Sequence, residues 1–316
     1  MAEKIAIEAR GLTKVYGFRK RVVAVENLDM RIEKGTIYGF IGPNGAGKTT
    51  TIKMLVGAIR PTRGEAYIFG EPVGSVRAKS YIGYSPEHPN FYSMHALDFL
   101  IYIGTLYGLP KDEAKGRAEE LLELFGLENS ADKNALTFSA GMKQKLSLAQ
   151  ALIADPEILI LDEPTANLDP IGRYEVLKNI EELARKEKGT VFISSHILLE
   201  LEKIIDHVTI IDRGKVILQS SMADLKRRFS ENHFVIDVSD NRLLLDILKK
   251  DENVTKVWVN HEGKIEVMVR DGKRFKEKAL EIFRTRRMEL NEFYPYKISL
   301  ENIFLKLLSN KSGDGE

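Results

Sequence analysis

Two kinds of apolar pattern in the first two thirds of the chain predict β-strands. Over residues 5–10 and 28–33, apolar side chains alternate with mostly polar ones, as in strands that bury one face. Apolar runs without charged residues occur at Ile37–Ile41, Ile158–Leu161 and Val191–Ile193. Such runs are typical of strands in a parallel sheet that is covered on both faces.

Apolar residues recur at helical spacing from about residue 88 to residue 156. They form two stripes, namely Ala118, Leu121, Leu122 and Phe125, and then Met142, Leu146, Ala149 and Ile153. Strands alternate with helices on either side of this segment. We therefore predict an α/β core with a mostly parallel sheet and an all-helical insertion over about 88–156.

The pattern changes after about residue 220. Strand and helix signals then follow in the order βαββαβ, over residues 234–238, 243–249, 254–259, 265–269, 275–283 and 290–294. This order predicts a small α+β domain of ferredoxin-like type. We therefore expect two domains, over residues 1–220 and 221–316.

Composition excludes several classes of protein. The 316 residues include 47 Lys+Arg and 46 Asp+Glu, a net charge of +1, so no nucleic-acid partner is expected. The absence of cysteine excludes disulfides, thiolate metal sites and cysteine catalysis. The uncharged stretch from Phe99 to Leu109 is shorter than the roughly 18 residues that a membrane-spanning helix needs. We expect a cytoplasmic protein.

Residues 42–49 match the phosphate-loop pattern and lie between a predicted buried strand and a predicted helix. Glycines allow successive backbone N–H groups to point at phosphate oxygens, and the helix N-terminus adds a favourable potential. Lys48 is expected to bridge the β- and γ-phosphates of ATP, and the Thr49 hydroxyl to bind Mg²⁺. A chance glycine turn is the alternative, and the flanking elements argue against it. The expected nucleotide-binding residues here are Gly42, Pro43, Asn44, Gly45, Ala46, Gly47, Lys48, Thr49 and Thr50.

The apolar run at 158–161 ends in two carboxylates, Asp162 and Glu163. Buried carboxylates are costly unless a cation meets them. We expect Asp162 to hold Mg²⁺ and Glu163 to act as the general base toward the attacking water. Alone, the pair would be interpreted as a solvated acidic turn, but the phosphate loop favours the catalytic interpretation.

Five segments in a fixed order closely resemble the motifs of the nucleotide-binding subunit of ABC transporters. They are the phosphate loop, Ser139–Gln144, Leu161–Pro164, Ala166–Asp169 and Ser194–His196. The resemblance covers about residues 3–220. It implies a P-loop NTPase cassette with an antiparallel β subdomain and a helical subdomain. It also implies a homodimer or paired cassette that encloses ATP, and a separate transmembrane permease at the inner face of the cell membrane.

The resemblance assigns further roles. Ser139 and Gly141 would contact the γ-phosphate bound by the partner subunit, although Ser139 alone would be interpreted as an N-cap. Asp169 would lie in the loop that communicates across the dimer interface. His196 would bind the γ-phosphate and help to position the water, and Tyr16 would stack on adenine.

One departure from the family pattern and one further likeness add to the resemblance. Glu87 stands where most members of the family carry a glutamine close to Mg²⁺, so a carboxylate would ligate the metal there. Residues 298–305 resemble the closing segment of cassettes from the branch that extrudes drugs, sodium and polysaccharides. This second likeness favours an exporter.

The sequence offers three other interpretations besides the exporter ATPase. A soluble ABC-type ATPase that acts on ribosomes or DNA usually carries two cassettes or a long coiled coil, and this chain has neither. A phosphate-loop GTPase or small-molecule kinase is not expected to carry the segment around Ser139. A ligand-sensing role for residues 222–316 is compatible with the transporter interpretation and stays open.

Overall fold

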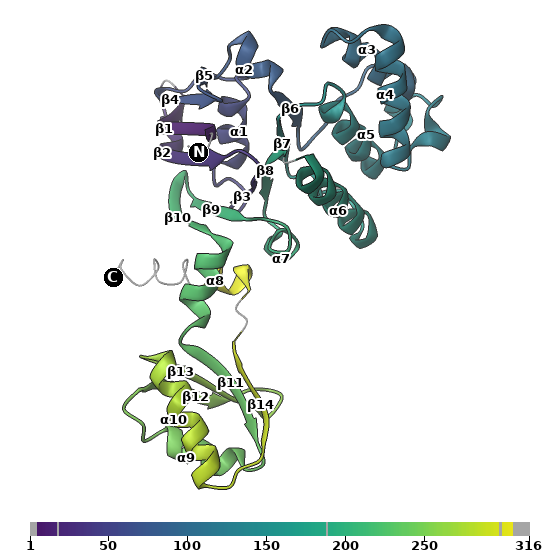
Figure 1. Cartoon of the computed structure of the whole chain (residues 1–316). Coiled ribbons are helices and arrows are strands. Elements are labelled where there is room, and N and C mark those ends of the chain that lie inside the picture. The colour runs from purple at the N-terminus through teal and green to yellow at the C-terminus, as the bar shows by residue number, and fades with distance from the viewer. Residues whose placement is uncertain (1–4, 18, 188, 297–298, 306–316) are drawn as a thin grey trace. The chain divides into compact units, whose positions relative to one another are not determined.

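A computed structural model gives the structure of the protein and describes residues 5–17, 19–187, 189–296 and 299–305 (Figure 1). The chain forms two compact units, Met1–Ser220 and Ser221–Glu316. Within the described residues, no helix is both long and apolar enough to cross a membrane.

The first unit begins with an antiparallel sheet whose strand order is β2-β1-β4-β5. Its strands are β1 (Ile5–Tyr16), β2 (Val22–Glu33), β4 (Arg63–Ile68) and β5 (Glu71–Pro72). The simple alternation predicted for residues 5–10 is wrong at Ala6, which is fully buried together with Ile7. The pairing of β1 with β2 shifts register between Ile5 and Ile7, so two successive side chains are enclosed.

A six-stranded sheet with the order β10-β9-β3-β8-β7-β6 forms the centre of the unit. Its strands are β3 (Ile37–Ile41), β6 (Ile82–Ser85), β7 (Ile158–Asp162), β8 (Thr190–Ser195), β9 (His207–Asp212) and β10 (Lys215–Ser221). Every residue of β3, β7 and β8 is buried, as the apolar runs predict. The helices that connect the strands are α1 (Lys48–Leu55), α2 (Val76–Ser80), α6 (Pro170–Glu187) and α7 (Leu198–Leu201).

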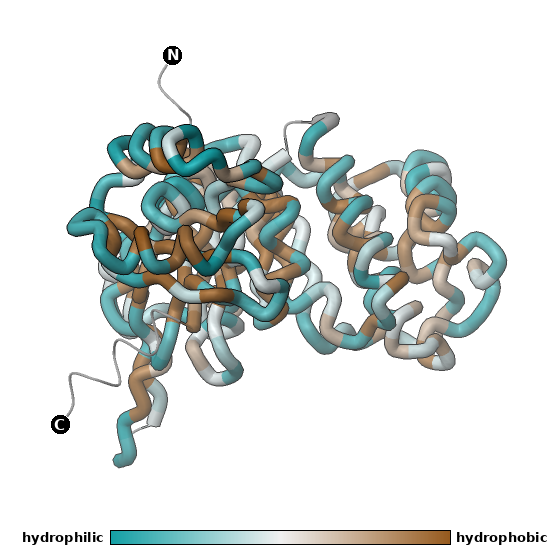
Figure 2. The backbone as a smooth tube through the Cα atoms, turned by 90° about the horizontal axis from the view of Figure 1, so that it is seen from below, coloured by the Kyte–Doolittle hydropathy of each residue, from teal (hydrophilic) through white to brown (hydrophobic). Residues whose placement is uncertain are grey.

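The insertion contains three α-helices and two short 3₁₀ turns, and Figure 1 shows it as a separate layer beyond β6 and β7. They are α3 (Ala96–Leu106), α4 (Lys111–Leu124), α5 (Ala140–Leu152), η1 (Glu128–Ser130) and η2 (Ala135–Thr137). The helical region begins at Ala96 rather than near residue 88, because Pro89 and its neighbours form an irregular segment. Brown and teal alternate along these helices (right in Figure 2), as expected when each helix buries one face.

Aromatic residues fill the centre of the first unit. The rings of Phe40 and Phe192 lie 5.3 Å apart, and Tyr38 stacks on Phe192 at 6.1 Å. The hydroxyl oxygen of Tyr38 lies 2.6 Å from that of Thr209, and burial raises the pKa of Tyr38 to about 12. These rings join β3 and β8, the strands that carry the phosphate loop and His196.

The second unit has the predicted βαββαβ order, preceded by a helix that the sequence pattern did not indicate. Its elements are α8 (Met222–Ser230), β11 (His233–Val238), α9 (Asn241–Leu248), β12 (Val254–Val259), β13 (Ile265–Val269), α10 (Gly272–Thr285) and β14 (Leu290–Pro295). The sheet order is β12-β13-β11-β14, with antiparallel pairs, which is the ferredoxin-like arrangement. Ser299 caps the helix that follows, and Ile298 lies outside the described residues.

Phe234→Ala tests the core of the second unit. Phe234 is fully buried against Phe275 and Phe293, with ring centroids at 5.3 and 5.7 Å. We expect the free energy of unfolding to fall by about 3–5 kcal/mol, the usual cost of removing a buried phenyl ring. Leu280→Ala, at a position that is 54% exposed, is the control. Equal effects of the two substitutions in urea denaturation of the full chain would contradict this packing.

Candidate nucleotide-binding site

The loop between β3 and α1 needs glycine at two positions. A Cβ atom on Gly42 would lie 2.2 Å from the carbonyl oxygen of Ile211, and one on Gly47 would lie 2.4 Å from that of Ala24. Gly47 also has a φ of +108°, which side chains strongly disfavour. Ala46 is buried beneath the loop. The first turn of α1 contains no acidic residue, so its N-terminus suits an anion.

Lys48, Glu163 and His196 form one connected network. The ammonium group of Lys48 donates to the carbonyl oxygens of Gly42 at 2.7 Å and Pro43 at 3.2 Å. It also lies 3.1 Å from Glu163 Oε1, and both side chains are about 95% buried. The other oxygen of Glu163 lies 2.8 Å from Nδ1 of His196. The structure thus brings together the three residues that the sequence predicts to be catalytic.

The sheet topology explains why these residues meet. Strand β8 lies between β3 and β7 and runs parallel to both, with Ser195 opposite Ile41 and Ser194 opposite Asp162. The phosphate loop follows β3, Glu163 follows β7 and His196 follows β8. Parallel strands end at the same edge of a sheet, which is where α/β proteins usually bind their ligands.

Asp162 is 1% exposed, and only one of its two carboxylate oxygens accepts a hydrogen bond. Its Oδ1 accepts a hydrogen bond of 2.7 Å from Ser194, whereas its Oδ2 is buried without a hydrogen-bond partner in the described structure. Burial raises the pKa of Asp162, the charges of Glu87 and Glu163 add to that effect, and the hydroxyl groups of Ser194 and Thr49 oppose it. This excess of negative charge around an orphaned oxygen fits a cation.

The oxygen atoms available at this place fit Mg²⁺ in particular. No three His, Asp or Glu side chains gather as a protein-only metal site among the residues that the structure describes. Mg²⁺ usually binds through one or two carboxylates and completes its shell with phosphate oxygens and water. Asp162 and the Thr49 hydroxyl meet that requirement beside the phosphate loop.

A cleft of about 340 Å³ opens above this network. Its lining residues are Ala24, Asn44, Gly45, Gly47, Lys48, Thr49, Thr50, Glu87 and Glu163. Glu87 therefore shares the cleft with Lys48 and Glu163, and its Oε1 lies 3.7 Å from Nε2 of His88. Sequence reasoning missed Ala24, since an alanine in a strand carries no chemical signal.

Five residues of the loop and of the strand ends next to it, Gly42, Pro43, Ala46, Asp162 and His196, are not among the lining residues, and neither are four predicted residues from other segments. Tyr16 is 42% exposed, and the Lys14 ammonium lies 5.2 Å from the centroid of its ring. Ser139 caps α5, and Asp169 accepts a 2.7 Å hydrogen bond from a backbone N–H in the first turn of α6. Gly141 faces Leu168, whose Cδ2 atom would lie 3.2 Å from a Cβ at that position. The segments that contain Gly141 and Asp169 are therefore neighbours.

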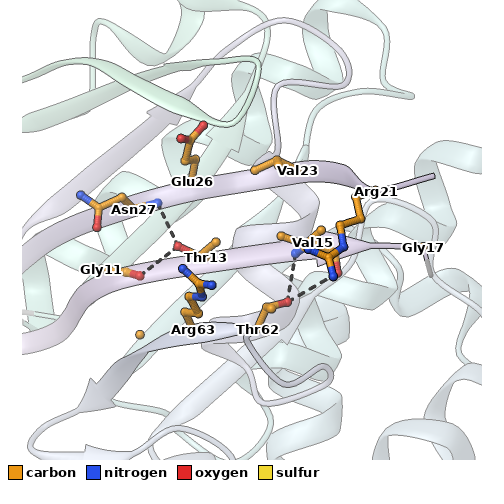
Figure 3. Close-up of a pocket in the computed structure, with 11 residues that line it drawn as sticks. Gly11, Thr13, Val15, Gly17, Arg21, Val23, Glu26, Asn27, Thr62 and Arg63 are labelled. Atoms are coloured by element: carbon orange, nitrogen blue, oxygen red, sulfur yellow. Dashed lines mark hydrogen bonds between the residues drawn. The ribbon is translucent and has the colours of Figure 1, made fainter. Parts of the chain in front are cut away.

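A second, larger groove of about 900 Å³ lies on the antiparallel sheet (Figure 3). Thr13, Val15 and Val23 point into it, and Thr62 binds the backbone N–H of Val15 at 3.0 Å. None of the phosphate-loop residues lines this groove. The smaller cleft, where the loop, Lys48 and Glu163 meet, is therefore the candidate nucleotide site.

The sequence matches known proteins over almost its whole length. The sequence model of the family described as "ABC transporter" matches residues 25–166. The chain is 38% identical over 305 residues to the bacitracin transport ATP-binding protein BcrA of Bacillus licheniformis, covering 96% of this chain and 97% of BcrA. It is 33% identical to the linearmycin resistance ATP-binding protein LnrL of Bacillus subtilis, covering 95% and 97% of the two chains.

Among solved structures, the fold is similar to the dimeric, post-hydrolysis state of the ATP-binding cassette MJ0796 bound to ADP and Pi. The TM-score is 0.64 at 22% identity, and the match covers 68% of this chain and 98% of that one. This likeness concerns the fold, and it confirms the predicted P-loop cassette.

Lys48→Ala tests the phosphate-binding assignment. Hydrogen bonds to charged groups contribute about 1.5–3 kcal/mol, so we expect the Kd for ATP to rise about 10- to 100-fold. Lys53→Ala, at an exposed position of the same helix, should leave the Kd unchanged. Titration calorimetry measures both values. Unchanged ATP affinity in Lys48→Ala would remove Lys48 from the phosphate site.

Proposed function

This chain belongs to the family of ABC transporter ATP-binding subunits, and from that premise we propose that it drives an exporter through closure of a cassette dimer around ATP. Members of this family bind ATP with Mg²⁺ and hydrolyse it, and this chain is such an ATPase. The connected network of Lys48, Glu163 and His196 is the observation that carries the proposed mechanism.

Lys48 changes partners in the proposed cycle. In the structure its charge is compensated by Glu163 and by two carbonyl oxygens of the loop. Phosphate oxygens in the cleft would attract the ammonium group more strongly, because they carry more negative charge than the carbonyl oxygens. This exchange would release Glu163 Oε1 to accept the proton of the attacking water.

His196 holds the general base in place from the other side. Its Nδ1 lies 2.8 Å from Glu163 Oε2, and its backbone N–H donates to the same oxygen at 3.3 Å. The ring is 43% exposed, so its second nitrogen is accessible to the γ-phosphate. Glu163 and His196 would thus act together on the two sides of the attacking water.

Thr49, Asp162 and Glu87 would hold the metal ion. When bound, Mg²⁺ neutralises charge that develops on the phosphate oxygens. The buried Oδ2 of Asp162 and the hydroxyl of Thr49 are the natural donors. Glu87 lines the cleft and would ligate the ion where a glutamine is usual, adding a negative charge beside the γ-phosphate.

The remaining predicted residues would contact the adenine ring of ATP or the second cassette of the dimer. Tyr16 is exposed enough to stack on adenine. Ser139 and Gly141 would contact the γ-phosphate of the opposite cassette, and Asp169 would line the dimer interface. The packing of Gly141 against Leu168 couples the segments that carry these roles.

In the proposed organisation, residues 1–220 form the cassette and the insertion over about 88–156 receives the permease. The protein would lie in the cytoplasm at the inner membrane face, held there by that permease. Residues 221–316 form an accessory domain. One relative with nearly full coverage is named for resistance to linearmycin, which favours export. A soluble ATPase acting on ribosomes or DNA is the second candidate, and the names of both relatives speak against it.

Glu163→Gln tests the general base. Turnover should fall about 10²- to 10⁴-fold, the usual effect of losing such a group, while ATP affinity is retained. Glu157→Gln, which alters an exposed carboxylate paired with Lys34, is the matched control. Phosphate release and titration calorimetry provide the two readouts. Near-normal turnover in Glu163→Gln would show that another group activates the water.

Affinity capture tests the proposed partner. Tagged Glu163→Gln should hold its ATP-bound dimer, and it should co-purify from detergent-solubilised native membranes with a polytopic protein in near-equal amount. The same capture without ATP shows which partners depend on the nucleotide. Recovery of ribosomal or DNA-repair proteins in place of a membrane protein would favour the soluble ATPase.

A further inference from the structure

One buried hydroxyl group links the carboxylate of Asp162 to the backbone of Glu163. Ser194 lies on β8 and is fully buried. Its Oγ donates a hydrogen bond of 2.7 Å to Asp162 Oδ1 and accepts one of 3.0 Å from the backbone N–H of Glu163. A serine hydroxyl has one proton to donate and lone pairs that accept, so the two contacts use both capacities.

The bond to Asp162 decides which carboxylate oxygen is available. Because Oδ1 receives the Ser194 proton, it is held on the side of β8. Oδ2 is buried without a hydrogen-bond partner in the described structure, and it is therefore the oxygen that can serve as a ligand to a cation. Partners that hold a metal ligand in orientation contribute strongly to metal affinity and to activity.

The bond to Glu163 supports a strained backbone. Glu163 has a φ of +49°, a left-handed conformation that residues other than glycine rarely adopt. Strain of this kind persists at functional sites where the surroundings over-determine it. The hydrogen bond from the Glu163 N–H to Ser194 is one such restraint, and it directs the side chain toward Lys48 and His196.

We propose that Ser194 is a positioning residue of the ATPase site, which sets the metal ligand Asp162 and the general base Glu163 with a single hydroxyl group. This inference rests on the proposed roles of those two carboxylates. Ser194 is fully buried and does not line the cleft, so it would act through Asp162 and Glu163. It ties β7 to β8, the strand that His196 follows, so that Asp162, Glu163 and His196 keep one geometry.

Ser194→Ala removes both hydrogen bonds without adding atoms. We expect kcat to fall about 10- to 100-fold, the usual cost of losing a partner behind a metal ligand. A second readout is independent of turnover, namely the Kd of a non-hydrolysable ATP analogue with Mg²⁺ and with EDTA. The gain in affinity that Mg²⁺ provides should shrink about 10-fold, while the Kd in EDTA is unchanged.

Two variants distinguish a loss of positioning from a general loss of stability. Ser194→Thr keeps the hydroxyl and should restore both the kcat and the Mg²⁺-linked affinity. Thr190→Val removes another buried hydroxyl from β8, at the end remote from the cleft, where it binds the backbone N–H of Gly35. This control should change thermal stability but not the ratio of the two Kd values. If Ser194→Ala does not fold, Ser194→Cys supplies a weak donor of similar size and should show the same losses.

Unchanged kcat and an unchanged Mg²⁺-linked affinity in a folded Ser194→Ala protein would overturn the inference. An equal loss of affinity with Mg²⁺ and with EDTA would also overturn it, because the hydroxyl would then support the fold alone. The proposed function fails separately, if Glu163→Gln retains its turnover.

Discussion

The parallel pairing of β3, β8 and β7 is the constraint on which the rest of the site depends. Each strand contributes a different function at its carboxyl end: the phosphate loop, His196 and the pair Asp162–Glu163. Register is fixed because all three strands are buried on both faces. A shift of one residue between β7 and β8 would place Ile193 or Ser195 opposite Asp162 and separate its carboxylate from the Ser194 hydroxyl.

Three buried charged side chains make this edge of the sheet suited to binding charged ligands. Lys48, Asp162 and Glu163 are 6%, 1% and 4% exposed, and isolated charges at such depth would be very costly. Lys48 and Glu163 compensate each other's charge. Asp162 has a hydrogen bond to only one of its oxygens, and the other is suited to a cation. Binding of a metal ion with phosphate would complete the charge balance and redistribute the contacts of Lys48.

The parts of the fold that can be predicted from the sequence are those encoded by a short stretch of consecutive residues. Apolar runs reveal β3, β7 and β8, and glycine spacing reveals the phosphate loop. The contacts of Ser194 could not be predicted from the sequence, because they depend on which strand lies beside β8. Ala6 was misplaced for a similar reason, since a register shift against β2 depends on tertiary pairing. The irregular start of the helical insertion and α8 likewise lack a strong periodic signal.

The second unit adds a structure with a core of its own. Its buried side chains, among them Phe234 and Phe275, come from its own sheet and helices. The alignment with BcrA spans 96% of this chain, whereas the match to the MJ0796 cassette spans 68%. The chain thus shares this unit with full-length relatives, while the cassette fold recurs without it. A module with a separate core can change in sequence without disturbing the sheet edge that holds Lys48, Asp162 and Glu163.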